Sequence, residues 1–389
     1  MQIKKNSDEI ILLVDDEPQI LKALKQELEI LPLDAPLSIV TCETTSSALE
    51  FLKENSERVF LLIADLRMPF PNLSGSDLLL QVHELYPQII LIMLTAYSDL
   101  PEIQKAITAE IQSLLFKPWD SNMLLAEIIK SRRLYHLDRE NRLLQEKIRQ
   151  QLEYAGEFQR KMLSSPLFET DDLHLELKYA PMPEYRCGGD YHDFFRLGPD
   201  KYIVAVGDVA GHGIKPAFIT AMLKVLATTL VREHRNITAS GFLTLMNKRL
   251  CRVLDSITDI VVTFSVLLIE PKIKKLHLAN AGHLPTFLLR DGENRVLQVG
   301  GTALGFLPDL HYEETQIEIQ KNDRLLLFTD GLIDLAEKQQ YLDDDLILSI
   351  LDSLPESEDL TGSIYERFKK FHRDGIYNDD VTVIAVTIQ

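Results

Sequence analysis

The sequence predicts two folded domains of different class joined by a long helix. Apolar runs alternate with helical stretches in the first third of the chain, which is typical of an α/β domain with a doubly wound parallel sheet. A charged, helical segment without proline follows. Strand-like runs, broken by two longer helical stretches, then continue to the end and indicate an α+β domain of stacked antiparallel sheets.

Length and composition limit the function before any motif is considered. The chain has 389 residues, of which 46% are hydrophobic, enough for two or three packed domains. Its formal charge of -18 argues against partners such as nucleic acid or an anionic membrane. The three scattered cysteines indicate a reducing compartment. We find no secretory leader and no uninterrupted apolar run long enough to span a bilayer, so we expect a cytoplasmic protein.

Four apolar runs define the expected N-terminal sheet, and each is followed by polar residues. The runs cover residues 9–14, 59–64, 89–94 and 114–116. Doubly wound sheets place their sites beyond the carboxyl ends of the strands. We therefore expect the residues that follow these runs to share one edge of the sheet: Asp15, Asp16, Asp65, Thr95 and Lys117.

The residue types at that edge fit phosphoryl transfer to a carboxylate. Asp15, Asp16 and Asp65 can hold one Mg²⁺, which prefers oxygen ligands. Asp65 is placed to accept a phosphoryl group, and Thr95 and Lys117 can contact the added oxygens.

Four motifs in this part of the chain carry a resemblance: Val14-Asp15-Asp16, Asp65-Leu66-Arg67-Met68-Pro69, Thr95-Ala96-Tyr97 and Lys117-Pro118-Trp119. Residues 9–130 resemble the flavodoxin-like receiver domain of two-component response regulators. The resemblance implies phosphorylation of Asp65 by a histidine kinase, metal contact from the Arg67 backbone and a cis bond before Pro118. Leu114 replaces the usual aromatic switch residue. The alternative is a receiver-shaped docking domain that is never phosphorylated.

A heptad pattern runs through the predicted linker, residues 131–165. One core position recurs every seven residues, and the complementary position is interrupted by Gln151. The pattern favours a coiled-coil homodimer, with Asn141 setting the register. A long amphipathic helix lying on domains of its own chain is the alternative. The two sets are Leu134, Asn141, Ile148, Ala155 and Met162, and Leu137, Leu144 and Phe158.

The C-terminal domain, residues 166–389, has recognisable strands and two predicted helices. The helices cover residues 216–233 and 240–254. Strand-like runs occur at residues 202–206, 261–270, 275–279, 286–289, 324–328 and 381–387.

Acidic residues stand at four positions of this domain, most of them next to a strand-like run. The motifs are Gly188-Gly189-Asp190, Asp208-Val209-Ala210-Gly211-His212-Gly213, Thr329-Asp330-Gly331 and Asn378-Asp379-Asp380-Val381-Thr382. Carboxylates gathered in one place raise each other's pKa unless a cation neutralises them. Because hard divalent cations prefer oxygen ligands, the pattern predicts Mn²⁺ or Mg²⁺, and two ions rather than one.

The order of these motifs is similar to that of the SpoIIE-like branch of the metal-dependent protein phosphatases, the PPM family. The resemblance implies an α-β-β-α sandwich and two-metal hydrolysis of a phosphoester. It carries the catalytic metal ligands over to Asp190, Asp208, Asp330 and Asp379, with the Val209 carbonyl as a backbone ligand. Asp379 is chosen over Asp380 because the first acid of this pair is the ligand in the family.

Several neighbouring residues allow two interpretations. His212 and His283 can protonate a leaving group or simply form structural hydrogen bonds. Arg186 can contact phosphate or form a surface ion pair. Asp193 is a candidate outer-shell acid, and Cys187 is expected to be inert.

Together these features predict a response regulator in which Asp65 phosphorylation controls a protein serine/threonine phosphatase. Family analogy indicates a phosphoserine substrate, an anti-sigma-factor antagonist with a STAS domain, in a partner-switching pathway. The alternative is an inactive, phosphatase-shaped adaptor that binds a partner when the receiver is phosphorylated.

Overall fold

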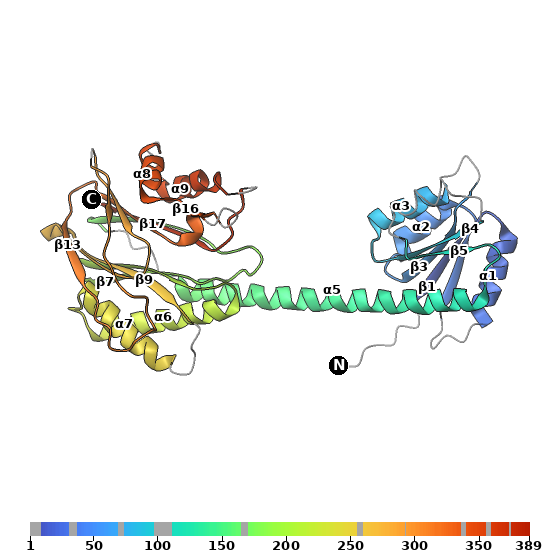
Figure 1. The fold of residues 1–389 in the computed structure, drawn as a ribbon, viewed down its shortest axis with the longest axis horizontal. Coiled ribbons are helices and arrows are strands. Elements are labelled where there is room, and N and C mark those ends of the chain that lie inside the picture. The colour runs from blue at the N-terminus through green and yellow to red at the C-terminus, as the bar shows by residue number, and fades with distance from the viewer. Residues whose placement is uncertain are drawn as a thin grey trace. The chain divides into compact units, whose positions relative to one another are not determined.

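The computed structural model describes residues 9–30, 37–68, 74–96, 111–164, 170–254, 260–291, 293–335, 340–354, 359–372 and 375–389. The chain divides into two compact units, Met1–Lys147 and Ile148–Gln389 (Figure 1). Helix α5 (Ser121–Leu163) contributes residues to both units.

The first unit is built on a parallel sheet of five strands. The strands are β1 (Ile10–Val14), β2 (Ser38–Cys42), β3 (Val59–Asp65), β4 (Ile90–Thr95) and β5 (Ser113–Phe116). Their order is β2-β1-β3-β4-β5, and every neighbouring pair is parallel. This is the order of flavodoxin-like doubly wound folds, so the predicted fold class is confirmed.

Helices cover both faces of this sheet because alternate strand residues point to opposite sides. The described helices besides α5 are α1 (Pro18–Ile30), α2 (Thr45–Asn55) and α3 (Gly75–Leu85). On one face, Ile10, Leu12 and Val14 pack with residues of α2 and α3. On the other face, Ile11 and Leu13 pack with α1 and the first turns of α5. Ser74 and Asp77 form a capping box that begins α3 next to the carboxyl end of β3.

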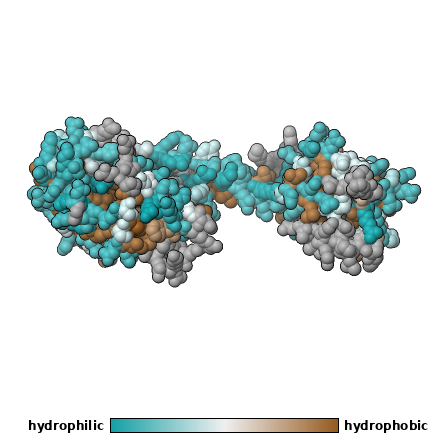
Figure 2. All heavy atoms as spheres, turned by 90° about the horizontal axis from the view of Figure 1, so that it is seen from above, coloured by the Kyte–Doolittle hydropathy of each residue, from teal (hydrophilic) through white to brown (hydrophobic). Residues whose placement is uncertain are grey.

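Helix α5 is 43 residues long and begins well before the predicted linker. Its first turns belong to the core of the first unit, where Leu124 and Ile128 are fully buried. Four apolar heptad residues farther along are exposed, whereas Ala155 and Met162 are half-buried. Other exposed hydrophobic side chains form patches on each unit (Figure 2). The exposed heptad residues are Leu137, Leu144, Ile148 and Phe158.

Two antiparallel sheets of five strands form the centre of the second unit. The first has the order β13-β10-β9-β8-β7 and the second β12-β11-β14-β17-β6. The strands of the first sheet are β7 (Asp190–Gly198), β8 (Lys201–Val209), β9 (Val262–Glu270), β10 (Lys275–Ala281) and β13 (Glu314–Glu318). Those of the second are β6 (Leu173–Ala180), β11 (Thr286–Leu289), β12 (Arg295–Leu297), β14 (Arg324–Phe328) and β17 (Val381–Ile388). A short hairpin, β15 (Asp334–Leu335) and β16 (Gln340–Tyr341), lies outside them.

Three apolar cores make this unit an α-β-β-α sandwich, as predicted. One core lies between the facing sheets and includes Val204, Leu267, Leu327 and Ile384. A second packs α6 (Ile214–Glu233) and α7 (Ala239–Val253) on the first sheet. A third packs α8 (Asp344–Asp352) and α9 (Leu360–Lys369) on the second sheet. In Figure 1, α8 and α9 lie on one side of the strands of this unit, and α6 and α7 lie on the other.

The sequence patterns located most of these elements but missed others. The predicted strands appear as β8, β9, β10, β11, β14 and β17, and the two predicted helices appear as α6 and α7. Helices α8 and α9 and strands β6 and β7 were not predicted.

One helix bears on the prediction that no uninterrupted apolar run is long enough to span a bilayer, although Lys224 interrupts its apolar run. Helix α6 is long and apolar enough to cross a membrane by length and composition, the only such helix among the described residues. Its buried residues include Ile219, Leu223 and Leu230, which belong to the core under the first sheet. The apolar character of α6 therefore has an explanation in packing within this domain.

Candidate functional site

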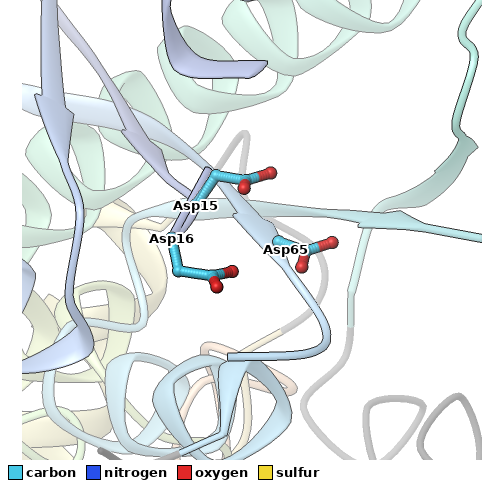
Figure 3. A group of neighbouring side chains, drawn as sticks. All are labelled: Asp15, Asp16 and Asp65. Carbon is cyan, nitrogen blue, oxygen red and sulfur yellow. The ribbon is translucent and has the colours of Figure 1, made fainter. Parts of the chain in front are cut away.

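Three acids of the first unit gather at the carboxyl edge of its sheet. The ligand atoms of Asp15, Asp16 and Asp65 all lie within 4.8 Å of one another. The side chains extend from the ends of β1 and β3 toward one side of the sheet (Figure 3). Asp15 and Asp65 are buried, and Asp16 is half-buried. This arrangement offers carboxylate oxygens to one divalent cation.

A lysine from the end of β5 balances part of this negative charge. The Nζ atom of Lys117 lies 2.7 Å from Asp15 Oδ2 and 2.8 Å from Asp65 Oδ1. Burial raises the pKa of Asp65, and the hydrogen bond from Lys117 opposes that rise. Burial alone would lower the pKa of Lys117, but its bonds to the two acids raise it overall. Lys117 is therefore charged at neutral pH and pairs with the acids.

The remaining predicted residues of this edge lie nearby in the fold. Thr95 is buried at the end of β4, and its hydroxyl donates to the Ala96 carbonyl at 3.1 Å. The peptide bond between Lys117 and Pro118 is cis, as expected. Arg67 follows β3 and has an exposed side chain. Leu114 is half-buried against the apolar core. Pro69 and Tyr97 lie outside the described residues.

In the second unit, strand pairing brings the predicted acids to one end of both sheets. Asp190 and Asp208 are directly opposite each other in the antiparallel pair β7 and β8. In the other sheet, Asp330 follows β14, and Asp379 precedes its neighbour β17. The backbone N–H of Thr329 donates to the Thr382 carbonyl at 3.1 Å and so continues this pairing beside the acids. Four separate segments thus supply carboxylates to the same region.

Two threonines hold Asp190 in place. Its Oδ2 atom accepts hydrogen bonds from the Thr329 hydroxyl at 2.8 Å and the Thr382 hydroxyl at 2.6 Å. The Thr382 N–H in turn donates to Thr329 Oγ1 at 2.9 Å. Asp190 is 1% exposed, so these bonds satisfy an oxygen that water does not reach. They leave Oδ1 for another partner.

The adjacent acids Asp379 and Asp380 have different surroundings. Asp380 is buried, and its two oxygens accept from the N–H groups of Met182 at 2.7 Å and Gly189 at 2.9 Å. Asp379 is half-buried and uses Oδ1 to accept from the Asp380 N–H at 2.8 Å. Asp380 therefore joins distant backbone segments, whereas Asp379 retains an oxygen for the site.

Burial and mutual repulsion raise the pKa values of these acids. For Asp208, burial and then the charges of Asp330 and Asp379 raise the pKa to about 8. Burial and Asp379 raise the pKa of Asp330 to about 6. Burial and Asp208 raise the pKa of Asp190 well above its usual range. Burial also raises the pKa of Asp379. Among the described residues, no lysine or arginine forms an ion pair with these four acids.

Two glycines, Gly188 and Gly189, let the backbone come close to the acids. A Cβ added to Gly189 would lie 2.3 Å from the Val209 carbonyl oxygen and 3.1 Å from Asp208 Oδ1. A Cβ added to Gly188 would lie 1.8 Å from Asp380 Oδ2. Glycine is therefore required here for space. The predicted backbone ligand, the Val209 carbonyl, lies beside Asp208 in this narrow region.

The donor set fits divalent metal ions of the hard class. It consists of carboxylate and carbonyl oxygens, and no cationic side chain neutralises it within the described residues. The raised pKa values record the cost of holding these acids together without a cation.

Comparisons with known proteins match both units of the chain. Residues 11–129 match the family model of the response regulator receiver domain, and residues 198–389 match that of stage II sporulation protein E (SpoIIE). The chain is a receiver joined to a SpoIIE-type protein phosphatase domain.

Individual relatives cover different parts of the chain. The phosphoserine phosphatase RsbU of Bacillus subtilis is 24% identical over 249 residues, which are 62% of this chain and 71% of RsbU. The phosphoserine phosphatase RsbP of the same species is 28% identical over 193 residues, which are 48% of this chain. This chain spans only 46% of RsbP. The solved SiaA-PP2C domain of Pseudomonas aeruginosa has a TM-score of 0.55 at 19% identity and covers 63% of this chain and 99% of that one, which shows a shared fold.

The structure also separates the alternatives around the phosphatase site. The Arg186 guanidinium lies 3.8 Å from Glu153, as in a surface ion pair. Asp193 pairs with Lys224 at 2.8 Å and accepts from the Tyr191 hydroxyl, which indicates a structural role. Burial raises the pKa of Cys187, as expected for an inert thiol.

The two histidines differ in their surroundings. The ring of His212 is exposed and stacks on Tyr185 with centroids 4.4 Å apart. His283 Nδ1 lies 2.8 Å from the Thr263 hydroxyl, and burial lowers the pKa of His283 to about 4. His283 is therefore neutral at pH 7.

Some contributors to the phosphatase site were missed from the sequence. Thr329 and Thr382 lie inside motifs that were noted only for their acids, so their positions beside Asp330 and Asp380 could have identified them. Asp334 raises the pKa values of Asp330 and Asp379, but no motif surrounds it.

Proposed function

We propose that this chain is a response regulator whose phosphatase domain hydrolyses phosphoserine on a partner protein, under control of Asp65 phosphorylation. The observation that carries the proposal is the convergence of Asp190, Asp208, Asp330 and Asp379 from four segments of two sheets. RsbU and RsbP, which are named phosphoserine phosphatases, support the substrate class.

The same four acids and the Val209 carbonyl are proposed to hold two Mn²⁺ or Mg²⁺ ions. Such ions would supply Lewis-acid polarisation of the phosphoester and lower the pKa of water. Unlike the trio at Asp65, the four acids form no group of three with ligand atoms within 4.8 Å among the described residues. Four carboxylates are more than one hydrated Mg²⁺ usually takes from a protein, so we propose two ions, which are about 3.5–4 Å apart in two-metal sites.

Residues of the phosphatase domain itself orient these groups. Thr329 and Thr382 fix one oxygen of Asp190, which leaves its other oxygen for a metal ion. A pocket of about 210 Å³ adjoins the acids and offers room for a phosphoseryl group. Because neutral His283 lines this pocket, we propose that it shapes substrate entry and is not the acid that protonates the leaving group. The pocket is lined by Asp208, Thr263, Gly282, His283, Leu284 and Asp330.

In the receiver, we propose that Asp65 accepts phosphate from a histidine kinase. Asp15, Asp16 and the Arg67 carbonyl, with Asp65, would hold one Mg²⁺. Lys117 already contacts Asp65 and would pair with an added phosphoryl oxygen, while Thr95 lies at the end of the adjoining strand. Phosphorylation would thereby add negative charge and acceptor oxygens at Asp65.

The proposal extends to partners and assembly. An anti-sigma-factor antagonist with a STAS domain is the proposed substrate, by analogy with partner switching. The proposed assembly is a homodimer through α5, in the cytoplasm. Exposed Leu137, Leu144 and Ile148 support the association, since a lone helix gains nothing from an exposed apolar seam.

The decisive experiment measures release of phosphate from phosphorylated STAS proteins with Mn²⁺, with and without beryllofluoride as a mimic of Asp65 phosphorylation. We expect hydrolysis whose rate changes with beryllofluoride in the wild type and not in D65N. An absence of hydrolysis, with partner binding that still depends on beryllofluoride, would overturn the proposal and support the adaptor instead.

A further inference from the structure

A buried glutamine near the end of α5 is bonded to the segment that leads into Asp190. Gln159 is 2% exposed. Its Nε2 atom donates to the Gly188 carbonyl at 2.7 Å and to Thr220 Oγ1 at 2.8 Å, and its Oε1 atom accepts from the Gly188 N–H at 3.0 Å. One side chain therefore satisfies both backbone groups of Gly188 and also reaches α6.

The same face of α5 touches this segment at a second point. Gly156 lies one helical turn before Gln159, and a Cβ added to it would lie 2.0 Å from the Arg186 carbonyl oxygen. Arg186 itself has a positive φ of 61°, which is uncommon for a residue with a side chain. Residues 186–188 thus follow the surface of α5 closely.

The opposite end of this short segment is attached to the acids. The Gly189 N–H donates to Asp380 Oδ2 at 2.9 Å, and the Gly189 carbonyl accepts from the Val209 N–H at 3.0 Å. Asp190 is the next residue along the chain. Only Gly188 and Gly189 therefore separate the contact with α5 from Asp190, a proposed metal ligand. The N–H and the carbonyl of both glycines are hydrogen-bonded.

We propose that Gln159 is a positioning residue that sets the place of Asp190, and that α5 acts on the metal site through it. The inference rests on the proposed function, because it assigns regulation to the same site. A shift or rotation of α5 would carry the Gln159 amide away from Gly188. The buried Gly188 N–H and carbonyl would then lack partners unless the segment moved with the helix.

Loss of the hydrogen bonds between Gln159 and Gly188 should change the affinity of the phosphatase site for metal. Hydrogen bonds that orient a ligand typically change metal affinity by about 10–100-fold when they are lost. Gln159 makes no bond to the acids themselves, so chemistry at full metal occupancy should change little. A residue that served only general stability would alter the unfolding temperature without a selective change in metal affinity.

The test compares Q159M with wild type in the full chain. Methionine has similar length but cannot bond to Gly188. We expect the Kd for Mn²⁺, measured by calorimetry, to rise by about 10–100-fold. Activity on p-nitrophenyl phosphate should return toward the wild-type kcat at high Mn²⁺. Hydrogen exchange should become faster at the Gly188 amide and stay unchanged in β9.

Controls separate this inference from the proposed function. Q151M changes an exposed glutamine of the same helix and should leave the Kd for Mn²⁺ unaltered. If Q159M does not fold, Q159N takes its place, because it keeps an amide whose reach is one methylene shorter. An unchanged Mn²⁺ Kd and unchanged Gly188 exchange in a folded variant would overturn the role of Gln159 alone. A wild-type chain that neither binds Mn²⁺ nor hydrolyses phosphoesters would overturn both.

Discussion

The two acidic sites of this chain solve the same electrostatic problem differently. In the receiver, Lys117 lies within 2.8 Å of both Asp15 and Asp65, so part of the negative charge is balanced within the fold. In the phosphatase domain, burial and like charges raise the pKa values of the acids, and no described lysine or arginine pairs with them. In the receiver, the lysine neutralises part of the acidic cluster before any metal binds. In the phosphatase domain, neutralisation of the acidic cluster depends on metal ions from solution.

The largest effect should follow from removing a phosphatase acid. D208N retains the shape of the side chain and removes its charge, so we expect phosphoester hydrolysis with Mn²⁺ to fall by about 10²–10³-fold, the range for loss of one electrostatic group. D171N alters an exposed acid and should retain activity. Phosphorylation of Asp65 by acetyl phosphate should be equal in both variants. Equal hydrolysis in D208N would remove Asp208 from the site.

Removing the internal cation should make the receiver resemble the phosphatase domain. K117M leaves buried Asp15 and Asp65 without their partner, and breaking a buried pair in this way costs roughly 3 kcal/mol. We expect lower stability of the receiver in urea, together with tighter Mg²⁺ binding because a repelling charge is gone. K130M, at an exposed site of α5, is the matched control. Weaker Mg²⁺ binding in K117M would contradict this comparison.

The pH dependence of the stability of the phosphatase domain should differ between the metal-free and the Mn²⁺-bound state. Asp208 and Asp330 have folded pKa values of about 8 and about 6, above their unfolded values of about 4. The metal-free folded state thus binds more protons than the unfolded chain between about pH 4 and pH 8, so its stability falls as pH rises through that window. Mn²⁺ should reverse the trend, since it binds the deprotonated acids. Thermal unfolding of the phosphatase domain at pH 6 and pH 8, with Mn²⁺ or EDTA, measures this.

The smallest effect should come from the threonines that orient Asp190. T329V removes one of two hydroxyl bonds to Asp190 Oδ2, so we expect about tenfold weaker Mn²⁺ binding. T382V should act similarly. Because the Thr382 N–H also bonds to Thr329 Oγ1, the double variant should show a non-additive loss. Calorimetric Mn²⁺ titration of the three variants checks this, and additive effects would argue against one network.

The acids of both sites could be predicted as site residues from the sequence, because the residue type and the end of an apolar run are visible within a short stretch of chain. Asp65, Asp208 and Asp330 each follow or close an apolar run, and parallel or antiparallel pairing then brings such ends together. The choice of Asp379 over Asp380 as the proposed metal ligand came only from the family pattern. The structure offers a physical reason for that choice, because both oxygens of Asp380 accept hydrogen bonds from the backbone.

Other features could not be read from local patterns. The role of Gln159 depends on a contact with Gly188, 29 positions away, and its neighbours in sequence indicate only an exposed helix. Helices α8 and α9 are short, and their apolar residues become meaningful only against the second sheet. By contrast, the charged, proline-free pattern from Asn122 to Met162 indicated α5 almost to its observed bounds, Ser121–Leu163.

The paired glycines before Asp190 have a consequence for variation at this position. Neither Gly188 nor Gly189 has a positive φ among the described backbone, so what forbids a side chain there is the nearness of Asp380 and of the Val209 carbonyl. At Gly211, with φ of 100°, an added Cβ would meet only Pro216 Cγ at 3.7 Å, so the restriction there is conformational instead. A saturation library should accordingly reject even alanine at Gly188 and Gly189 because of steric overlap, and favour glycine at Gly211 because of backbone strain.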